Sequence, residues 1–321
     1  MPSSSVVVRA SAAVLLLVAS AYLFAVIKCE CGPLSIDEAL ALVLPWGAFR
    51  YFILIPFAMM AAEALLVGWP NSSLAAILRW TPSIRGDAFY LALQILFVPL
   101  LTTVGLWHLS EFARLHSLQL GVIENPVAQF AVIFVVNDFA NYWVHRLMHA
   151  STALWEAHKV HHSATDLNLM MCFRFHPLEV TVLAIVPTMT FLLLGATLEI
   201  FAAFAFVHML LGQVQHARVN WTYGLLGKVL VSPAFHRFHH SQHREDFDHN
   251  FGARLVIWDQ LFGTCSTRVI GPGDIGVDDN TYVGRPLLVE FFRPFFHFVV
   301  VVARTLRGLH SGPWRWAAAR N

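Results

Sequence analysis

Eight histidines between residues 145 and 240 fall into three short clusters. They are His145, His149, His158, His161, His162, His236, His239 and His240. On a helix, residues three and four positions apart share one face, and the neutral imidazole is the commonest side-chain ligand of metals. The spacing therefore predicts a metal site. Eight imidazoles exceed the number that one zinc or one iron takes up, so we predict two metal ions.

A hydrolase or a metal transporter would account for fewer of these histidines. The first cluster, HRLMH, lacks the glutamate that acts as general base in the HExxH motif of metalloproteases. A zinc-dependent membrane hydrolase would need a carboxylate base, for which Glu156 and Glu179 are the candidates, and it would leave most of the histidines unused. A metal transporter would carry its ligands inside the membrane spans, whereas these clusters follow the ends of apolar segments.

The composition indicates a membrane protein. Of the 321 residues, 57% are hydrophobic and 13% are charged, and the mean hydropathy is +0.60. Segments 6–27, 44–67, 89–107 and 127–144 approach the roughly 20 apolar residues that span a bilayer. Segments 178–196 and 200–211 predict a short helical hairpin. We therefore expect an all-α integral membrane protein of about four transmembrane helices plus this hairpin, capped by a cytoplasmic, helical, histidine-rich metal domain.

The arginines orient these segments. Arg79 and Arg85 lie in the loop after the second segment, whereas the loop after the first has only Lys28 at its start. The positive-inside rule places the loop with the arginines in the cytoplasm. Counting forward, every cluster falls on the cytoplasmic side, of a bacterial inner membrane or of the endoplasmic reticulum in a eukaryote. A signal peptide is the alternative for segment 6–27, but no clean cleavage site follows it. Residues 291–306 predict an interfacial helix.

Several functional classes are disfavoured by charge and motifs. The formal net charge is +1 and no basic run stands out, so we expect no nucleic-acid partner. The four cysteines form no CxxC pair, which argues against a disulfide scaffold and a thiolate zinc site. Neither a GxGxxG motif after a strand nor the CxxCH motif of haem attachment is present. A redox reaction would therefore take its electrons from a separate protein.

Two features indicate how the clusters are held. Ser232 and Pro233 have the residue types of a helix N-cap and first helical position, which predicts a helix carrying the third cluster. Asp138 lies seven residues before His145, two helical turns away on the same face, where its carboxylate could accept the outer N–H of a ligating imidazole. The alternative for Asp138 is an intramembrane cap or salt bridge.

The order HxxxH, HxxHH, HxxHH resembles the fatty acid hydroxylase and sterol desaturase superfamily. The similarity extends to Asp138, Tyr142, Trp143, Leu154, Trp155, Ser163, Arg174-Phe175-His176-Pro177-Leu178-Glu179, Gln215-His216, Pro233, Asn250-Phe251-Gly252 and Trp258-Asp259-Gln260-Leu261-Phe262-Gly263-Thr264. It covers about residues 127–264. We therefore expect N-terminal transmembrane helices without an assigned motif at 1–126, a catalytic domain similar to fatty acid hydroxylases at 127–268, and a C-terminal tail with an interfacial helix at 269–321.

The resemblance implies a non-haem di-iron centre that uses dioxygen and two external electrons on a lipid C–H bond. It implies nine iron ligands, which are the eight clustered histidines and His216. Five more residues are candidates for contact with the metal or for support of its ligands: His208, His176, Asp138, Asn250 and Asp259. For His208 the alternative is packing within a helix, and His176 could instead line a substrate tunnel. We expect solvated or remote positions for His108, His116, His243, His249, His297 and His310.

Hydroxylation and desaturation begin with the same step, and these motifs do not separate them. The set HHS, RxHP and WDxxFGT resembles the bacterial and alkylglycerol-monooxygenase-like branch more than the sterol desaturases, which favours a lipid hydroxylase. Fatty acyl lipids, ornithine lipids, sterols and alkylglycerols are all candidate substrates. The expected electron donor is a ferredoxin or a cytochrome with its reductase, and zinc could replace iron in purified protein.

Overall fold

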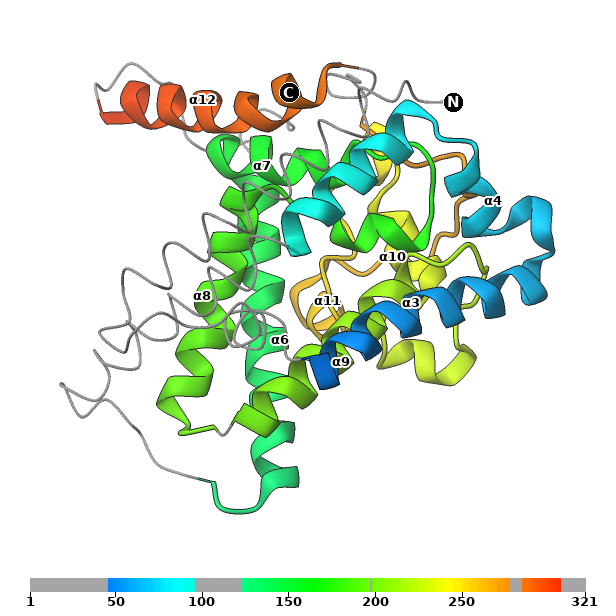
Figure 1. Cartoon of the computed structure of the whole chain (residues 1–321). Helices are drawn as coiled ribbons and strands as arrows, with labels where there is room; N and C mark the ends of the chain where they lie inside the picture. Colours follow the sequence, from blue (N-terminus) through cyan, green and yellow to red (C-terminus); the bar gives the residue numbers. More distant parts are fainter. Residues whose placement is uncertain (1–45, 96–122, 197, 278–284, 307–321) are drawn as a thin grey trace, which may run out of the picture.

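The computed structural model describes residues 46–95, 123–196, 198–277 and 285–306 (Figure 1). All regular elements in these ranges are helical, and extended backbone pairs only in two isolated bridges, Leu230–Leu255 and Ser241–Ile275. The prediction of an all-α fold is thus confirmed for the described part of the chain. The α-helices are α3 (Trp46–Val67), α4 (Ser73–Leu78), residues 82–95, α6 (Pro126–Ala150), α7 (Thr152–His162), α8 (Pro177–Leu193), α9 (Leu198–Gln215), α10 (Pro233–His239), α11 (Ile257–Phe262) and α12 (Leu287–Leu306). Short 3₁₀ turns are η1 (Trp69–Asn71), η2 (Leu169–Phe173), η3 (Gly224–Lys228) and η4 (Arg244–Asp246).

Among the described residues, α6 is the one helix long and apolar enough to cross a bilayer. It contains the predicted segment 127–144 and continues through the first histidine cluster. Helices α8 and α9 are shorter and apolar, at the positions of the predicted hairpin. Segment 6–27 lies outside the described residues, as does most of segment 89–107. The number of spans and their cytoplasmic orientation therefore remain predictions.

A single residue separates α6 from α7. The Ser151 side chain accepts a hydrogen bond from Leu154 N–H and caps α7, while Ser151 N–H donates to Leu147 O at the end of α6. The chain turns sharply there, and Figure 1 shows α7 at the upper end of α6. This turn brings the first histidine cluster, on α6, next to the second, on α7.

The other two helices that frame the clusters begin with a cap followed by proline. His176 accepts from Leu178 N–H ahead of Pro177 in α8, and Ser232 accepts from Phe235 N–H ahead of Pro233 in α10. The predicted start of α10 is therefore confirmed.

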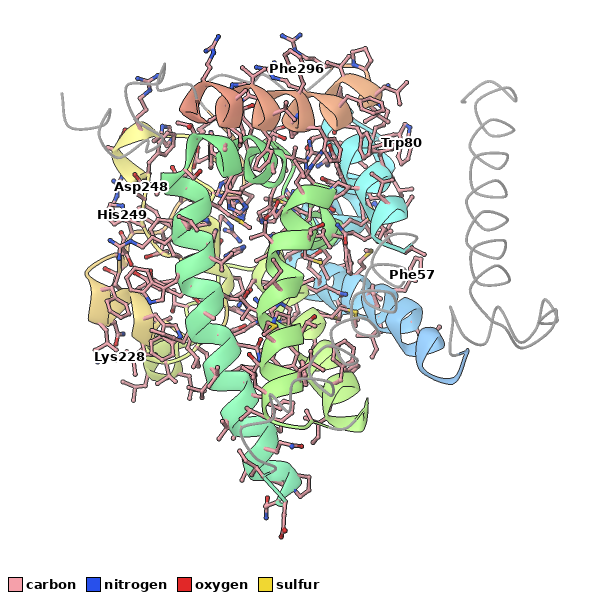
Figure 2. All side chains as sticks on the ribbon, turned by 90° about the vertical axis from the view of Figure 1, so that its left-hand side faces the viewer. Phe57, Trp80, Lys228, Asp248, His249 and Phe296 are labelled. Carbon is pink, nitrogen blue, oxygen red and sulfur yellow. The ribbon has the colours of Figure 1, made fainter. Side chains whose placement is uncertain are left out.

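Helices α6, α8 and α9 pack together away from α7. Ile133, Phe191, Ile200 and Phe204 form a buried apolar cluster there. Figure 2 shows α6 and α8 running side by side beneath α12, which lies across their upper ends with Phe296 on its outer side. Helix α12 packs against α7, so it covers the end of the bundle where the histidines are.

Candidate metal centre

Nine histidines form two groups whose geometry could each hold a metal ion. Within each group, one nitrogen per histidine lies within 4.8 Å of all the others. The first group is His145, His149, His158, His162 and His239; the second group is His161, His216, His236 and His240. The structure thus brings together all nine histidines that the sequence and the resemblance suggested as ligands.

The two HxxHH clusters are divided between the groups in opposite ways. On α7, His158 and His162 belong to the first group and His161 to the second. At α10, His236 and His240 belong to the second group and His239 to the first. In each cluster the pair at i and i+4 shares one face, while the histidine at i+3 is rotated away toward the neighbouring group. The two helices therefore hold the groups next to each other, and the rings of His162 and His240 are 4.5 Å apart.

Spacing between the ring nitrogens fits coordination of a common ion. In the first group, His158 Nε2 is 3.0 Å from His145 Nε2 and 3.1 Å from His162 Nε2. In the second, His236 Nε2 is 3.1 Å from both His216 Nε2 and His240 Nε2. Imidazole nitrogens about 2.1 Å from a metal and at right angles around it lie about 3.0 Å apart.

The outer ring nitrogens of four of these histidines donate hydrogen bonds that fix their orientation. The acceptors are Phe251 O for His145 (2.8 Å), Glu179 Oε1 for His158 (2.6 Å), Gly212 O for His216 (2.7 Å) and His249 O for His239 (2.8 Å). A proton on Nδ1 leaves the Nε2 lone pair available to a metal. His239 Nε2 is buried and has no hydrogen-bond partner, which would be costly unless an ion binds there. The donor set therefore fits two metal ions.

Burial keeps these imidazoles neutral. It lowers the pKa of His158 to about 3 and that of His216 to about 4. Burial and the neighbouring histidines lower the pKa values of His161, His162 and His240 well below the usual range. At neutral pH each ring is in the form that binds metals.

Asn250 and Asp259 lie in the loop behind the groups. The Asp259 carboxylate accepts from Phe251 N–H (2.8 Å) and Gly252 N–H (2.7 Å) and so fixes the carbonyl that holds His145. Asn250 has a positive φ of 59° and donates to Phe235 O, next to His236. Both residues support backbone beside the ligands, and neither belongs to a histidine group.

Asp138 does not make the hydrogen bond that its spacing suggested. Its Oδ2 accepts from Leu255 N–H (3.0 Å) and Trp258 Nε1–H (2.8 Å), while the outer nitrogen of His145 bonds to Phe251 O instead. Asp138 thus ties α6 to the segment that leads into α11.

His176 and His208 lie outside both groups. His176 caps α8, and its Nε2–H donates to Phe291 O of α12 at 2.9 Å. His208 stacks on Phe204 and faces a cavity. His243 is exposed, as expected. His249, labelled beside the upper part of α6 in Figure 2, holds His239 through its carbonyl, a role that its side chain does not reveal.

A cavity of about 380 Å³ extends from the histidines between α8 and α9. Both groups reach it, through His145, His158, His161, His216 and His236. Its walls along the two helices are mostly apolar: Val180, Leu183, Ala184, Pro187, Phe201, Phe204, Ala205 and Met209. Glu179, which is part of the motif that carries the resemblance and was a candidate base of a hydrolase, also lines the cavity. An apolar chain held here would lie beside both groups.

Comparison with known proteins agrees with this geometry. Residues 130–264 match the family model described as fatty acid hydroxylase. The chain is 33% identical over 172 residues to the ornithine lipid hydroxylase OlsE of Rhizobium tropici, covering 53% of this chain and 51% of that protein. It is 32% identical over 131 residues to alkylglycerol monooxygenase of Homo sapiens, covering 41% of this chain and 29% of that protein. It is also 27% identical over 178 residues to a putative methylsterol monooxygenase of Dictyostelium discoideum, covering 54% and 61%.

The chain therefore spans about half of the ornithine lipid hydroxylase and under a third of alkylglycerol monooxygenase. No solved structure matches it significantly. The family match contains every histidine of both groups. The comparisons therefore support the resemblance to the fatty acid hydroxylase and sterol desaturase superfamily, through a fatty acid hydroxylase domain at residues 130–264.

Proposed function

We propose that this protein is a membrane-bound, oxygen-dependent enzyme that hydroxylates a C–H bond of a lipid at a centre of two iron ions. The observation that carries the proposal is the pair of histidine groups opening on one apolar cavity. The relatives are by name a lipid hydroxylase and a monooxygenase, which supports the same reaction class. We propose the nine grouped histidines as the ligands.

The residues of this chain would hold the ions and shape the site. Activation of dioxygen with two external electrons is the chemistry that bound iron supplies. Backbone carbonyls and Glu179 orient the imidazoles, and the mostly apolar walls of α8 and α9 exclude water and align an alkyl chain with the histidines. The electrons would come from a ferredoxin or a cytochrome with its reductase.

The surface of α6 supports an integral membrane location. Its 25 residues would extend about 37 Å, more than the hydrocarbon thickness of about 30 Å. Exposed apolar side chains follow one stripe along it: Val132, Val135, Val136, Phe139 and Trp143. Such a stripe suits contact with lipid. We propose a multi-pass protein with its metal centre on the cytoplasmic side, of a bacterial inner membrane or of the endoplasmic reticulum.

The outer face of α12 suits the interfacial helix proposed for the C-terminal tail. Leu288, Phe292, Phe296 and Val299 are exposed on it. We propose the tail at 269–321 as a unit that follows a catalytic domain at 127–268, with further transmembrane helices at 1–126.

Hydroxylation is favoured over desaturation because the ornithine lipid and alkylglycerol relatives are by name a hydroxylase and a monooxygenase. A zinc hydrolase is disfavoured, since Glu179, one of its two candidate bases, already accepts a hydrogen bond from His158, and Glu156, the other, does not line the cavity. Fatty acyl lipids, ornithine lipids, sterols and alkylglycerols remain the candidate substrates.

The test compares total lipids, by mass spectrometry, from cells producing the native chain and cells producing His239→Ala. His243→Ala is the matched control, because His243 is an exposed histidine outside both groups. A lipid class that gains one oxygen with the native chain and the control, but not with His239→Ala, supports the proposal. Loss of two hydrogens would instead identify a desaturase. Two negative results together would contradict the proposal. The purified native protein would contain no iron, and the host would form no lipid product even when supplied with the four substrate classes and an electron donor.

A further inference from the structure

Arg254 is a buried cation in the wall of the cavity. Its side chain is only 9% exposed. It lines the cavity together with His208, Gly212 and Gln215. Burial lowers the pKa of Arg254 to about 10, so the guanidinium is still charged at neutral pH. An arginine so placed needs a partner, because a buried charge is costly without one.

The partners that the protein supplies are neutral. Arg254 Nη1 donates to Gln215 Oε1 (2.8 Å) and to Ala253 O, and Nη2 donates to His208 O (2.9 Å). Its Nε has no partner, and the described residues give Arg254 no ion pair. A guanidinium has five N–H donors, so these bonds leave two unused.

Asp138 is the carboxylate that attracts Arg254 through space. It lies too far away to form an ion pair with Arg254: its Oδ2 accepts from Leu255 N–H and Trp258 Nε1–H, and its Oδ1 has no hydrogen-bond partner. The guanidinium therefore keeps donors for an anion that enters the cavity, and a planar guanidinium is well suited to carboxylate and phosphate oxygens.

Arg254 also lies close to the second histidine group. A Cβ on Gly212 would be 3.3 Å from Arg254 Nη2, and Gly212 O accepts the hydrogen bond from His216 Nδ1. Gly212, which lies against the guanidinium, is thus one helical turn before the proposed ligand His216. The apolar walls extend from this end along α8 and α9.

We propose that Arg254 binds an anionic oxygen, of a carboxylate or a phosphate, in the headgroup of the lipid substrate. The lipid then enters headgroup first, its chain lies along α8 and α9, and the carbons near the headgroup are those held beside the histidines. This inference rests on the proposed lipid-oxidising function and narrows its substrate to an acidic lipid.

The test uses three probes built on a 16-carbon chain: hexadecanoate, its methyl ester and hexadecyl phosphate. Their affinities are measured for the purified full-length, iron-loaded protein in one non-ionic detergent. We expect at least one of the two anions to bind about tenfold or more tightly than the ester, as charged hydrogen bonds would provide. The anion that binds more tightly identifies the headgroup as a carboxylate or a phosphate.

The variants separate this effect from partition into detergent. Arg254→Met should bring the ratio of anion to ester affinity close to one while leaving the affinity for the ester unchanged. Arg254→Lys should retain part of the preference. Arg304→Met, which removes an exposed arginine on α12, should behave as native protein.

A native protein that binds the ester as tightly as both anions overturns the inference, whether or not any variant folds. So does an Arg254→Met protein that binds ester normally and keeps the preference for an anion. A native protein that prefers an anion but oxidises no lipid would leave the binding site standing and count against the proposed reaction instead.

Discussion

Nδ1 of His158 donates a hydrogen bond of 2.6 Å to Glu179 Oε1, and both side chains are buried. His158 is also the member of the first histidine group whose Nε2 lies close to both His145 and His162. A carboxylate behind a ligating imidazole fixes its orientation and strengthens it as a ligand. Glu179, on α8, therefore connects the wall of the cavity to the first group.

Glu179→Ala should reduce iron affinity by about 10- to 100-fold, the usual cost of removing such a partner. Glu179→Gln should lose less iron affinity, because the amide oxygen of glutamine can still accept a hydrogen bond from His158. The measurement is iron retention against a competing chelator. Glu245→Ala, at an exposed position in η4, is the control. Native iron retention in Glu179→Ala would show that this contact only packs the helices.

Gly252→Ala should destabilise the protein by about 1–3 kcal/mol and lower its iron content. An added Cβ would lie 2.6 Å from Leu255 O and 2.7 Å from Asp259 Oδ2, in the loop whose Phe251 carbonyl holds His145. Thermal unfolding in detergent measures the stability.

The control for this substitution is Gly273→Ala, because nothing lies within 4 Å of the added Cβ there. Equal melting temperatures for the two variants would mean that the loop accommodates the added methyl group without disturbing His145.

The parts of the site that were predictable from sequence are those that side-chain type and helical spacing determine. The apolar segment 127–144 and the Ser232-Pro233 pair locate α6 and the start of α10 because apolar length and capping act locally. His208 shows that sharing a helix face is not sufficient. It is eight residues before His216, which directly follows α9, and eight helical residues rise about 12 Å, too far for both rings to bind one ion.

What was not predictable depends on backbone and on tertiary contacts. The carbonyls of Phe251, Gly212 and His249 orient three imidazoles, but every residue has a carbonyl, so no residue type reveals this role. The partner of Asp138 was likewise undetermined, since Trp258 reaches it from 120 residues away. The division of each HxxHH cluster between two groups follows from how α7 and α10 face each other.

Stability of the iron-free protein should fall as the pH is lowered from about 7 to about 4. His158 and His216 have folded-state pKa values of about 3 and about 4, below the unfolded value of 6.5. Between these values the unfolded chain binds more protons, so the free energy of unfolding decreases with falling pH, by up to about 1.4 kcal/mol per pH unit for each histidine. Above about pH 7 this contribution is constant.

Melting temperatures measured across this range test the expectation. Bound iron should reduce this loss of stability at moderately acidic pH, because ligand binding stabilises the folded state. A melting temperature of iron-free protein that stays constant from pH 7 to pH 4 would contradict the burial of neutral imidazoles.

Ala205→Phe should strongly reduce lipid oxidation without removing iron. Ala205 lines the cavity on α9, and a phenyl ring there would displace a chain lying along the helix. Since small misplacements of a reacting carbon cost about 10²-fold in rate, we expect a loss of that order in oxidised lipid at native iron content. Ala203→Phe is the matched control, because Ala203 is exposed on the same helix. Equal activity of the two variants would mean that the substrate reaches the histidines by a route other than the cavity between α8 and α9.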